Sequence, residues 1–229
     1  MKKTLKIVLI IFIILALVIA GVLYWQRDNI AALRMAMTYD TQQIAEQMSE
    51  QDKALKTQIE TYFPDGIRDF TEEEIRQIEK GETTEKQLLA KIVSEAAAAN
   101  PEKDTPKTPT KAEQEQAIIS RYVSQLYSLE GEYLGKIDGL ISSAIAEYKQ
   151  KRDGKNNRSL QLSIGAAYTG KLTALEGECD GRVNALLAQM DAELTAIGAD
   201  KAILTTIRTA YRNEKTAKRA YYMSKYGVK

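Results

Sequence analysis

Residues 117–148 read AIISRYVSQLYSLEGEYLGKIDGLISSAIAEY, and the spacing of their large side chains predicts one long helix. These side chains recur in steps of 4, 4, 3, 4, 4, 3, 4 and 4 residues and form a bulky row of Ile118, Tyr122, Leu126, Leu129, Tyr133, Ile137, Leu140, Ala144 and Tyr148. Steps of 4, 4 and 3 add up to eleven residues in three turns, about 3.67 residues per turn. The period predicts nearly straight helices or a slight right-handed supercoil rather than a left-handed heptad coiled coil.

A second stretch repeats these steps after the polar segment 151–159. Its bulky row is Ile164, Tyr168, Leu172, Leu175, Cys179, Val183, Leu186, Met190 and Leu194. With an offset of 46 residues, the LEGE at 129–132 recurs at 175–178, and Tyr122 corresponds to Tyr168. We interpret the two stretches as an internal duplication of one helix. The alternative is a chance likeness of two helices rich in alanine and leucine.

A row of small residues lies two positions behind each bulky row, about 200° around the helix. In the first stretch this small-residue row is Ser120, Ser124, Ser128, Gly131, Gly135, Gly139, Ser142 and Ala146. In the second stretch it is Ala166, Gly170, Ala174, Gly177, Gly181, Ala185, Ala188 and Ala192. Because glycine inside a helix costs about 1 kcal/mol relative to alanine, we expect the glycines to admit a neighbouring backbone. The predicted helix-packing residues are Gly131, Gly135, Gly139, Gly177 and Gly181.

Folding the two stretches about residue 156 predicts an antiparallel hairpin over residues 112–199, about 60 Å long. In this register Gly131 faces Gly181, Gly135 faces Gly177 and Tyr133 faces Cys179. One row would close the hairpin, and the other would receive a third helix from the carboxyl-terminal segment 200–229.

The amino-terminal part contains 20 uncharged residues in a row, Ile7 to Gln26. As a helix they span about 30 Å, the thickness of the hydrocarbon core, whereas a cleaved signal has an apolar core of about 7–15 residues. We therefore predict a retained transmembrane signal anchor at 7–26. The lysines before it predict a cytoplasmic tail at 1–6 and an extracytoplasmic remainder. Cleavage after Ala20, which would give a secreted protein, is the alternative.

The segments between the anchor and the hairpin are also read as helical. Residues 27–63 carry a helical apolar stripe and are predicted to continue the anchor as a stalk. Residues 64–99 are predicted to hold two short helices, and Thr71 with Glu74 forms a capping box. Residues 100–111 are a linker of Pro, Thr and Lys, after which Thr110 and Glu113 form a second capping box. The predicted fold class is all-α.

The residue inventory excludes several kinds of chemistry. The chain has no histidine and a single cysteine, Cys179, so it lacks histidine-based triads, histidine-ligated zinc and an internal disulfide. We predict no catalytic residue, no cofactor and no metal. The acidic side chains of the LEGE repeats, Glu130, Glu132, Glu176 and Glu178, could do acid–base work. Ion pairs across the hairpin, Glu130 with Arg182 and Glu176 with Lys136, are the simpler interpretation.

The carboxyl-terminal segment is the predicted interaction site. Residues 201–229 hold eight Lys and Arg against one acid, a net charge of +7. The candidate residues are Arg208, Arg212, Lys215, Lys218, Arg219, Tyr211, Tyr221 and Tyr222. Basic and aromatic side chains together suit anionic headgroups or wall polymers, and no nucleic-acid recognition fold is evident. Residues 38–99 carry 14 acids and 7 bases, so pairing within the protein or between copies is the alternative.

These observations predict a single-pass, membrane-anchored extracytoplasmic scaffold or binding module that is not an enzyme. Its partner would be another protein, a second copy, or an anionic headgroup or wall polymer. A secreted helical domain that binds such a polymer or a protein partner is the second reading. A carboxylate-only enzyme or metal protein is the third, and a spacer that holds another protein's partner at a fixed height is the fourth.

Overall fold

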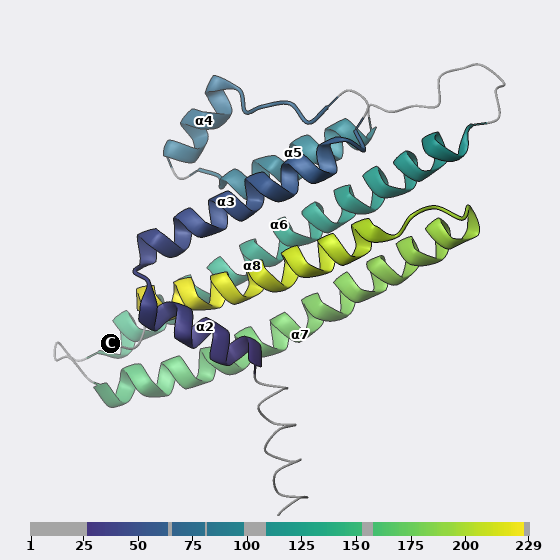
Figure 1. The fold of residues 1–229 in the computed structure, drawn as a ribbon. Coiled ribbons are helices and arrows are strands. Elements are labelled where there is room, and N and C mark those ends of the chain that lie inside the picture. Colours follow the sequence, from purple (N-terminus) through teal and green to yellow (C-terminus); the bar gives the residue numbers. More distant parts are fainter. Residues whose placement is uncertain (1–26, 64–65, 81, 99–108, 153–157, 227–229) are drawn as a thin grey trace, which may run out of the picture. The chain divides into compact units, whose positions relative to one another are not determined.

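The computed structural model describes residues 27–63, 66–80, 82–98, 109–152 and 158–226, and within these ranges it is all-α (Figure 1). The helices are α2 (Arg27–Thr38), α3 (Thr41–Glu60), α4 (Glu72–Glu79), α5 (Glu85–Ala98), α6 (Lys111–Lys151), α7 (Arg158–Ala196) and α8 (Ala202–Tyr226). None of these described helices is both long and apolar enough to cross a membrane. The predicted tail at 1–6, the anchor at 7–26 and most of the predicted linker at 100–111 lie outside the described residues.

The chain divides into two compact units. The first contains the described residues up to Thr57 together with those from Ala202 onward, and the second contains Gln58–Lys201.

The first unit is built from α2, most of α3, and α8. Its core consists of Ala32, Ile44 and Ala220, which are fully buried, with partly buried side chains of Met35, Ala36, Met48 and Tyr221 packed around them. The small side chains Ala32 and Ala220 let α2 and α8 approach each other closely.

The predicted single stalk over 27–63 is two helices, separated at Tyr39–Asp40. The Gln43 backbone N–H donates to Asp40 Oδ1 at 2.8 Å, and the Asp40 N–H donates to Gln43 Oε1 at 3.0 Å. This reciprocal pair caps the amino terminus of α3 in the manner of a capping box. The cap begins a new helix in the middle of the apolar stripe, so the stripe does not correspond to one rod.

The second unit contains α4 to α7. Both predicted capping boxes are confirmed: Thr71 with Glu74 begins α4, and Thr110 with Glu113 begins α6. Arg68 joins α4 to α5, because it donates to Glu74 at 2.7 and 2.9 Å and to Glu95 at 3.1 Å. The hydrogen bonds that Glu74 accepts from Arg68, followed by the one from the Thr71 backbone, lower the pKa of Glu74 to about 2.

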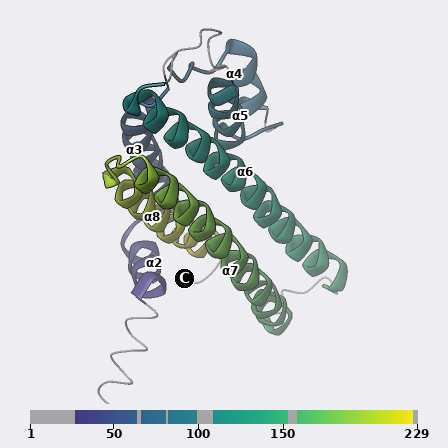
Figure 2. The same ribbon diagram turned by 90° about the vertical axis from the view of Figure 1, so that its right-hand side faces the viewer.

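Helix α5 lies along the amino-terminal half of α6 (Figure 2). Their contact uses small side chains, since a Cβ added at Gly131 would lie 3.7 Å from Ala90 Cβ. Ser120 and Ser124, from the same small-residue row, are buried. The amino-terminal half of this row therefore packs against α5.

Helices α6 and α7 contact each other along their lengths (Figures 1 and 2). Their hydrogen-bonded pairs run from Arg121 with Glu193 to Tyr148 with Gln161, so the two helices are antiparallel. Gly198, with φ +65°, follows the carboxyl end of α7, and its carbonyl accepts a hydrogen bond from Lys111 at the start of α6.

Candidate functional site

The predicted interaction residues of α8 form two neighbouring groups. Arg208 and Arg212 are exposed, and Lys215 and Arg219 are half-buried. With steps of 4, 3 and 4 residues, these four side chains lie on one stripe of the helix, which we call the basic row. Lys218 is half-buried and lies beside this row.

The tyrosines of α8 pack with its lysines. Lys215 Nζ lies 5.6 Å from the ring centroid of Tyr211, and Lys225 Nζ lies 5.2 Å from that of Tyr221. The rings of Tyr221 and Tyr222 meet edge to face with centroids 5.5 Å apart. Tyr211, Tyr221 and Tyr222 are half-buried, so they support the basic side chains rather than forming an open stacking platform.

Arg219 joins the basic row to α2. Arg219 Nη1 donates to Asn29 Oδ1 at 2.6 Å, and Thr41 and Ser224 share a hydrogen bond of 3.1 Å nearer the carboxyl end of α8. These two contacts fix the orientation of α8 in the first unit. Residues 208–219 therefore lie on a helix held by the Ala32–Ile44–Ala220 core.

The predicted helix-packing glycines do not bring α6 and α7 together. A Cβ added at Gly135, Gly139, Gly177 or Gly181 would find no atom of a neighbouring element within 4 Å, and Gly131 faces Ala90 of α5. The predicted facing pairs Gly131 with Gly181 and Gly135 with Gly177 are thus corrected. The physical reason is that α6 and α7 meet through their bulky rows, whose tyrosines keep the two backbones apart.

Three buried tyrosines of the bulky rows each donate to a glutamate on the other helix. Tyr122 binds Glu193 at 2.6 Å, Tyr133 binds Glu178 at 2.6 Å, and Tyr168 binds Glu147. A buried phenol needs a hydrogen-bond partner, and the glutamate on the facing helix supplies it for each of these tyrosines. Desolvation is the main cause that raises the pKa of all three phenols.

A cationic side chain also lies over each of these three rings. Arg121 lies over Tyr122 at 5.1 Å, Lys136 over Tyr133 at 4.5 Å, and Lys171 over Tyr168 at 4.1 Å, measured to the ring centroid. The cations and the glutamate acceptors come from corresponding positions, because each directly precedes a member of a bulky row. We call these positions the charged flank; its charged members at this interface are Arg121, Glu132, Lys136 and Glu147 on α6 and Lys171, Glu178, Arg182 and Glu193 on α7.

The ion pairs at mid-helix differ from the predicted ones by two residues. Arg182 binds Glu132 at 2.8 Å instead of Glu130, and Lys136 lies 3.5 Å from Glu178 instead of binding Glu176. When two equivalent helices pack antiparallel, a given flank of one helix faces the same flank of the other. Glu130 and Arg182 lie on opposite flanks, so the predicted pair was geometrically excluded.

Neighbouring tyrosines and cations lower the pKa values of the carboxylates in the charged flank. Tyr122 lowers the pKa of Glu193 and Tyr133 that of Glu178, each mainly by donating a hydrogen bond. Lys136, followed by Arg182, lowers the pKa of Glu132. These carboxylates are therefore held as anions in structural pairs, which is the opposite of what a general acid requires.

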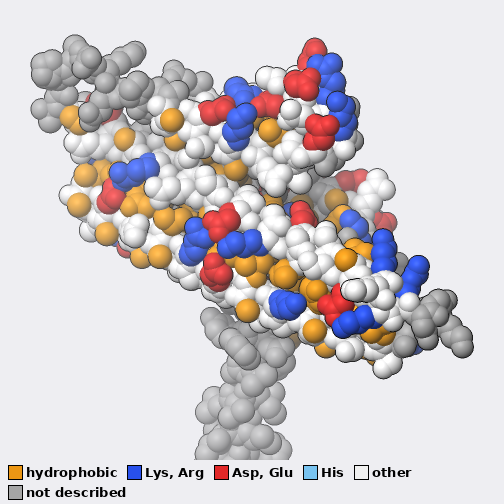
Figure 3. Space-filling view, turned by 180° about the vertical axis from the view of Figure 1, so that it is seen from behind, with side chains coloured by type: hydrophobic (Ala, Val, Ile, Leu, Met, Phe, Trp, Pro, Cys, Tyr) orange, Lys and Arg blue, Asp and Glu red, His pale blue; other side chains and the backbone are white. Residues whose placement is uncertain are grey.

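Cys179, a member of the bulky row of α7, is half-buried. Among the described residues, no group of three or more acidic or cysteine side chains could hold a metal ion. On the face seen in Figure 3, acidic and basic side chains are interspersed with hydrophobic ones.

No protein family, curated protein or solved structure matches this chain.

Proposed function

We propose that the protein is a single-pass, membrane-anchored helical scaffold or binding module, with its amino terminus cytoplasmic and its bulk extracytoplasmic. The observation that carries the proposal is the basic row on α8, where Arg208 and Arg212 are exposed on a helix with a fixed core. The uncharged run 7–26 supports the anchor. The glutamates of the α6–α7 interface are engaged in structural pairs, which favours a binding role over catalysis.

Within this proposal, residues 112–199 are a hairpin of two copies of one helix with an eleven-residue period. Its support is the equivalence of the contacts under the offset of 46 residues. Tyr122 with Glu193 corresponds to Tyr168 with Glu147, because residue 122 maps to 168 and residue 147 to 193. Lys136 with Glu178 corresponds in the same way to Arg182 with Glu132. Two copies of one sequence would produce such exchanged pairs when they run antiparallel.

The anchor is tested by the topology of the full chain in its native membrane. We expect the protein to resist alkaline extraction, and an external protease to digest residues beyond 27 while residues 1–6 stay protected. Protection of the carboxyl terminus with cleavage at the amino terminus would refute the orientation. Mass spectrometry of the mature amino terminus separates this proposal from the alternative, because a secreted protein cleaved after Ala20 would begin at Gly21.

The binding role is tested by charge reversal. The double variant Arg208→Glu and Arg212→Glu should lose the partners, whether protein, anionic lipid or wall polymer, that cross-link to the wild-type protein in intact cells. Lys149→Glu with Arg152→Glu is the matched control, since these exposed cations lie at the carboxyl end of α6 and do not belong to the basic row. Equal cross-linking by both variants would favour a spacer whose basic row has no ligand.

The paired helices are tested by a charge exchange. Arg182→Glu places a third acid beside Glu132 and Glu178 and should lower the thermal midpoint of unfolding. Adding Glu132→Arg should restore the midpoint at least in part, because the pair is then reversed rather than broken. No rescue would contradict the register.

A further inference from the structure

Helix α2 has two apolar faces, and only one of them is used within the first unit. Ala32, Met35 and Ala36 belong to the core or pack against it. Ile30, Leu33 and Met37 lie on the other side of the helix, and these side chains are 46%, 52% and 79% exposed. Their spacing of three and four residues makes them one continuous stripe of about two turns.

This exposed stripe and the basic row lie on the same side of the α2–α8 pair. Arg219 of the basic row binds Asn29 of α2. Leu33 follows Asn29 by four residues, so it lies one turn along the same face of α2. Met223, which is 37% exposed, follows Arg219 by four residues on α8. The hydrogen bond between Arg219 and Asn29 therefore joins an apolar strip to a cationic strip.

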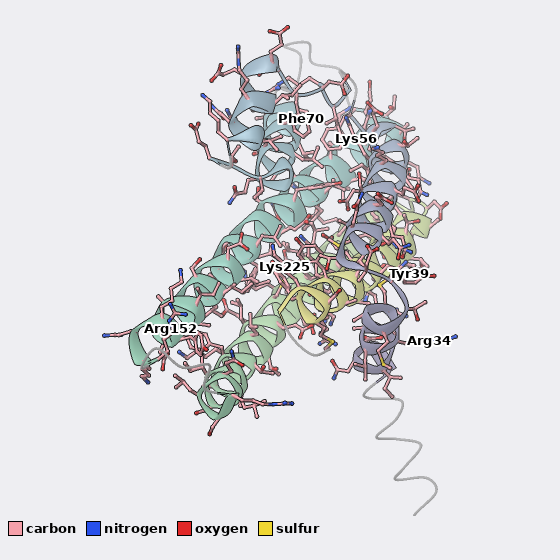
Figure 4. All side chains as sticks on the ribbon, turned by 90° about the vertical axis from the view of Figure 1, so that its left-hand side faces the viewer. Arg34, Tyr39, Lys56, Phe70, Arg152 and Lys225 are labelled. Carbon is pink, nitrogen blue, oxygen red and sulfur yellow. The ribbon has the colours of Figure 1, made fainter. Side chains whose placement is uncertain are left out.

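Further positive charge borders the stripe. Arg34 is exposed and extends away from α2, and Tyr39 lies at the bend between α2 and α3 (Figure 4). Exposed apolar side chains flanked by arginine, lysine and tyrosine are typical of surfaces that lie in the interfacial region of a bilayer. In that region apolar side chains reach the boundary between headgroups and acyl chains. Each cation that interacts with anionic headgroups contributes about 1 kcal/mol of binding free energy.

The position of the stripe in the chain favours a lipid surface as the partner that covers it. Leu33 is seven residues beyond Gln26, the last residue of the uncharged run, which corresponds to about 10 Å of helical rise. If residues 7–26 span a bilayer, Ile30 and Leu33 lie within reach of its surface. A soluble partner would have to compete with a lipid surface already present at this short distance.

We propose that the α2–α8 face, with Ile30, Leu33 and Met37 as its apolar part and Arg208, Arg212, Lys215 and Arg219 as its cationic part, docks on the anionic surface of the bilayer that holds the anchor. This inference rests on the proposed anchor. It adds that the first unit lies on the membrane rather than standing away from it, and it assigns the basic row to lipid headgroups.

The test places a fluorophore on the full chain in vesicles. In a Cys179→Ala background, single variants Leu33→Cys, Met37→Cys and Gln51→Cys are labelled with a small fluorophore. Gln51 is an exposed polar residue of α3 and serves as the control. The protein is reconstituted in phosphatidylcholine vesicles with roughly one third phosphatidylglycerol, and a spin label on the acyl chain near the headgroup is the quencher. We expect at least twofold stronger quenching at positions 33 and 37 than at 51.

The charge contribution is measured in the same system. Quenching at positions 33 and 37 should fall in pure phosphatidylcholine, and also in the variant Arg208→Glu with Arg212→Glu, because the headgroup attraction is lost. Lys149→Glu with Arg152→Glu should leave the quenching unchanged. Equal quenching at positions 33, 37 and 51 would overturn the inference.

A label at Ala16→Cys, quenched by a spin label at the end of the acyl chain because residue 16 is the midpoint of the run 7–26, separates this inference from the proposed anchor. Quenching at position 16 without quenching at 33 and 37 would retain the anchor and refute the docked face. Loss of quenching at all three positions would refute both. Energy transfer between copies labelled at position 37 that rises with protein density, without lipid quenching, would show that a second copy covers the face and would also overturn the inference.

Discussion

Helices α6 and α7 carry corresponding rows of small residues, yet the two rows have different neighbours. In α6, Ser120 and Ser124 are buried and Gly131 faces Ala90 of α5. The corresponding residues of α7, Ala166, Gly170 and Gly177, are exposed. Small side chains permit a close approach without specifying which helix approaches. Which helix packs on a small-residue row depends on the neighbouring segments of the sequence. Of the two helices, only α6 has α5 packed against it.

The largest expected difference between the two rows comes from the same substitution made at corresponding positions of α6 and α7. Gly131→Leu should lower the free energy of unfolding by about 1–3 kcal/mol, because its side chain must displace Ala90 on α5. Gly177→Leu, at the corresponding position of α7, should cause no loss, since a Cβ there meets open space. Urea unfolding followed by circular dichroism measures both. Equal destabilisation would mean that the row of α7 is also covered.

The bulky rows give the next largest effect. Tyr122→Phe keeps the ring in the interface and removes the hydrogen bond to Glu193, which keeps its hydrogen bond from Arg121. Hydrogen bonds to charged groups contribute about 1.5–3 kcal/mol, and the partial exposure of Glu193 places the expected loss near the lower end. The thermal midpoint should fall accordingly.

Tyr127→Phe is the control for that variant. Tyr127 is a buried tyrosine of α6 outside the bulky row, so its substitution leaves the charged flank intact. A Tyr122→Phe protein as stable as the wild type would show that the hydroxyl bond contributes nothing to the pairing of α6 with α7.

The helices and their caps could be predicted from sequence because the determinants are local. Thr71 with Glu74 and Thr110 with Glu113 begin helices at the expected residues. The cap formed by Asp40 and Gln43 is equally local, and it was missed because the apolar stripe running through it was taken as one helix. An Asp followed three residues later by Gln was the available signal.

The contacts of the candidate site depend on non-local packing and were predicted less well. The small-residue row offered no information about α5. The charged flank could have been predicted from the sequence. Its members on α6 directly precede bulky residues and are opposite in charge to the members of α7 that they meet in antiparallel order; they are Arg121, Glu132, Lys136 and Glu147. The prediction placed glutamates on the wrong flank because it considered their distance along the helix and not their angle around it.

A smaller effect, of opposite sign, sharpens the comparison. Gly181→Ala should raise the free energy of unfolding by about 0.5–1 kcal/mol, because alanine loses less backbone entropy in a helix and its methyl group meets open space. Gly135→Ala on α6 should gain a similar amount, since this part of the row extends beyond α5. Chemical denaturation measures each, and a loss of stability at either position would indicate a neighbour that excludes a methyl group.

Acid is expected to have the smallest of the predicted effects. Lowering the pH should weaken the α6–α7 contact, and it should affect the α5–α6 contact of small residues less. The pKa values of Glu132, Glu178 and Glu193 are lower in the folded protein than the ordinary value of 4.5. A carboxyl whose folded pKa is depressed stabilises the fold above its unfolded pKa, and this contribution is lost as the pH falls through the folded value. Because these side chains are substantially exposed, solvent screens each pair and the individual effects are small. Hydrogen exchange between pH 5 and pH 3, corrected for the intrinsic rate, should show α7 losing protection before α5. The opposite order would mean that the charged flank does not hold α7 on α6.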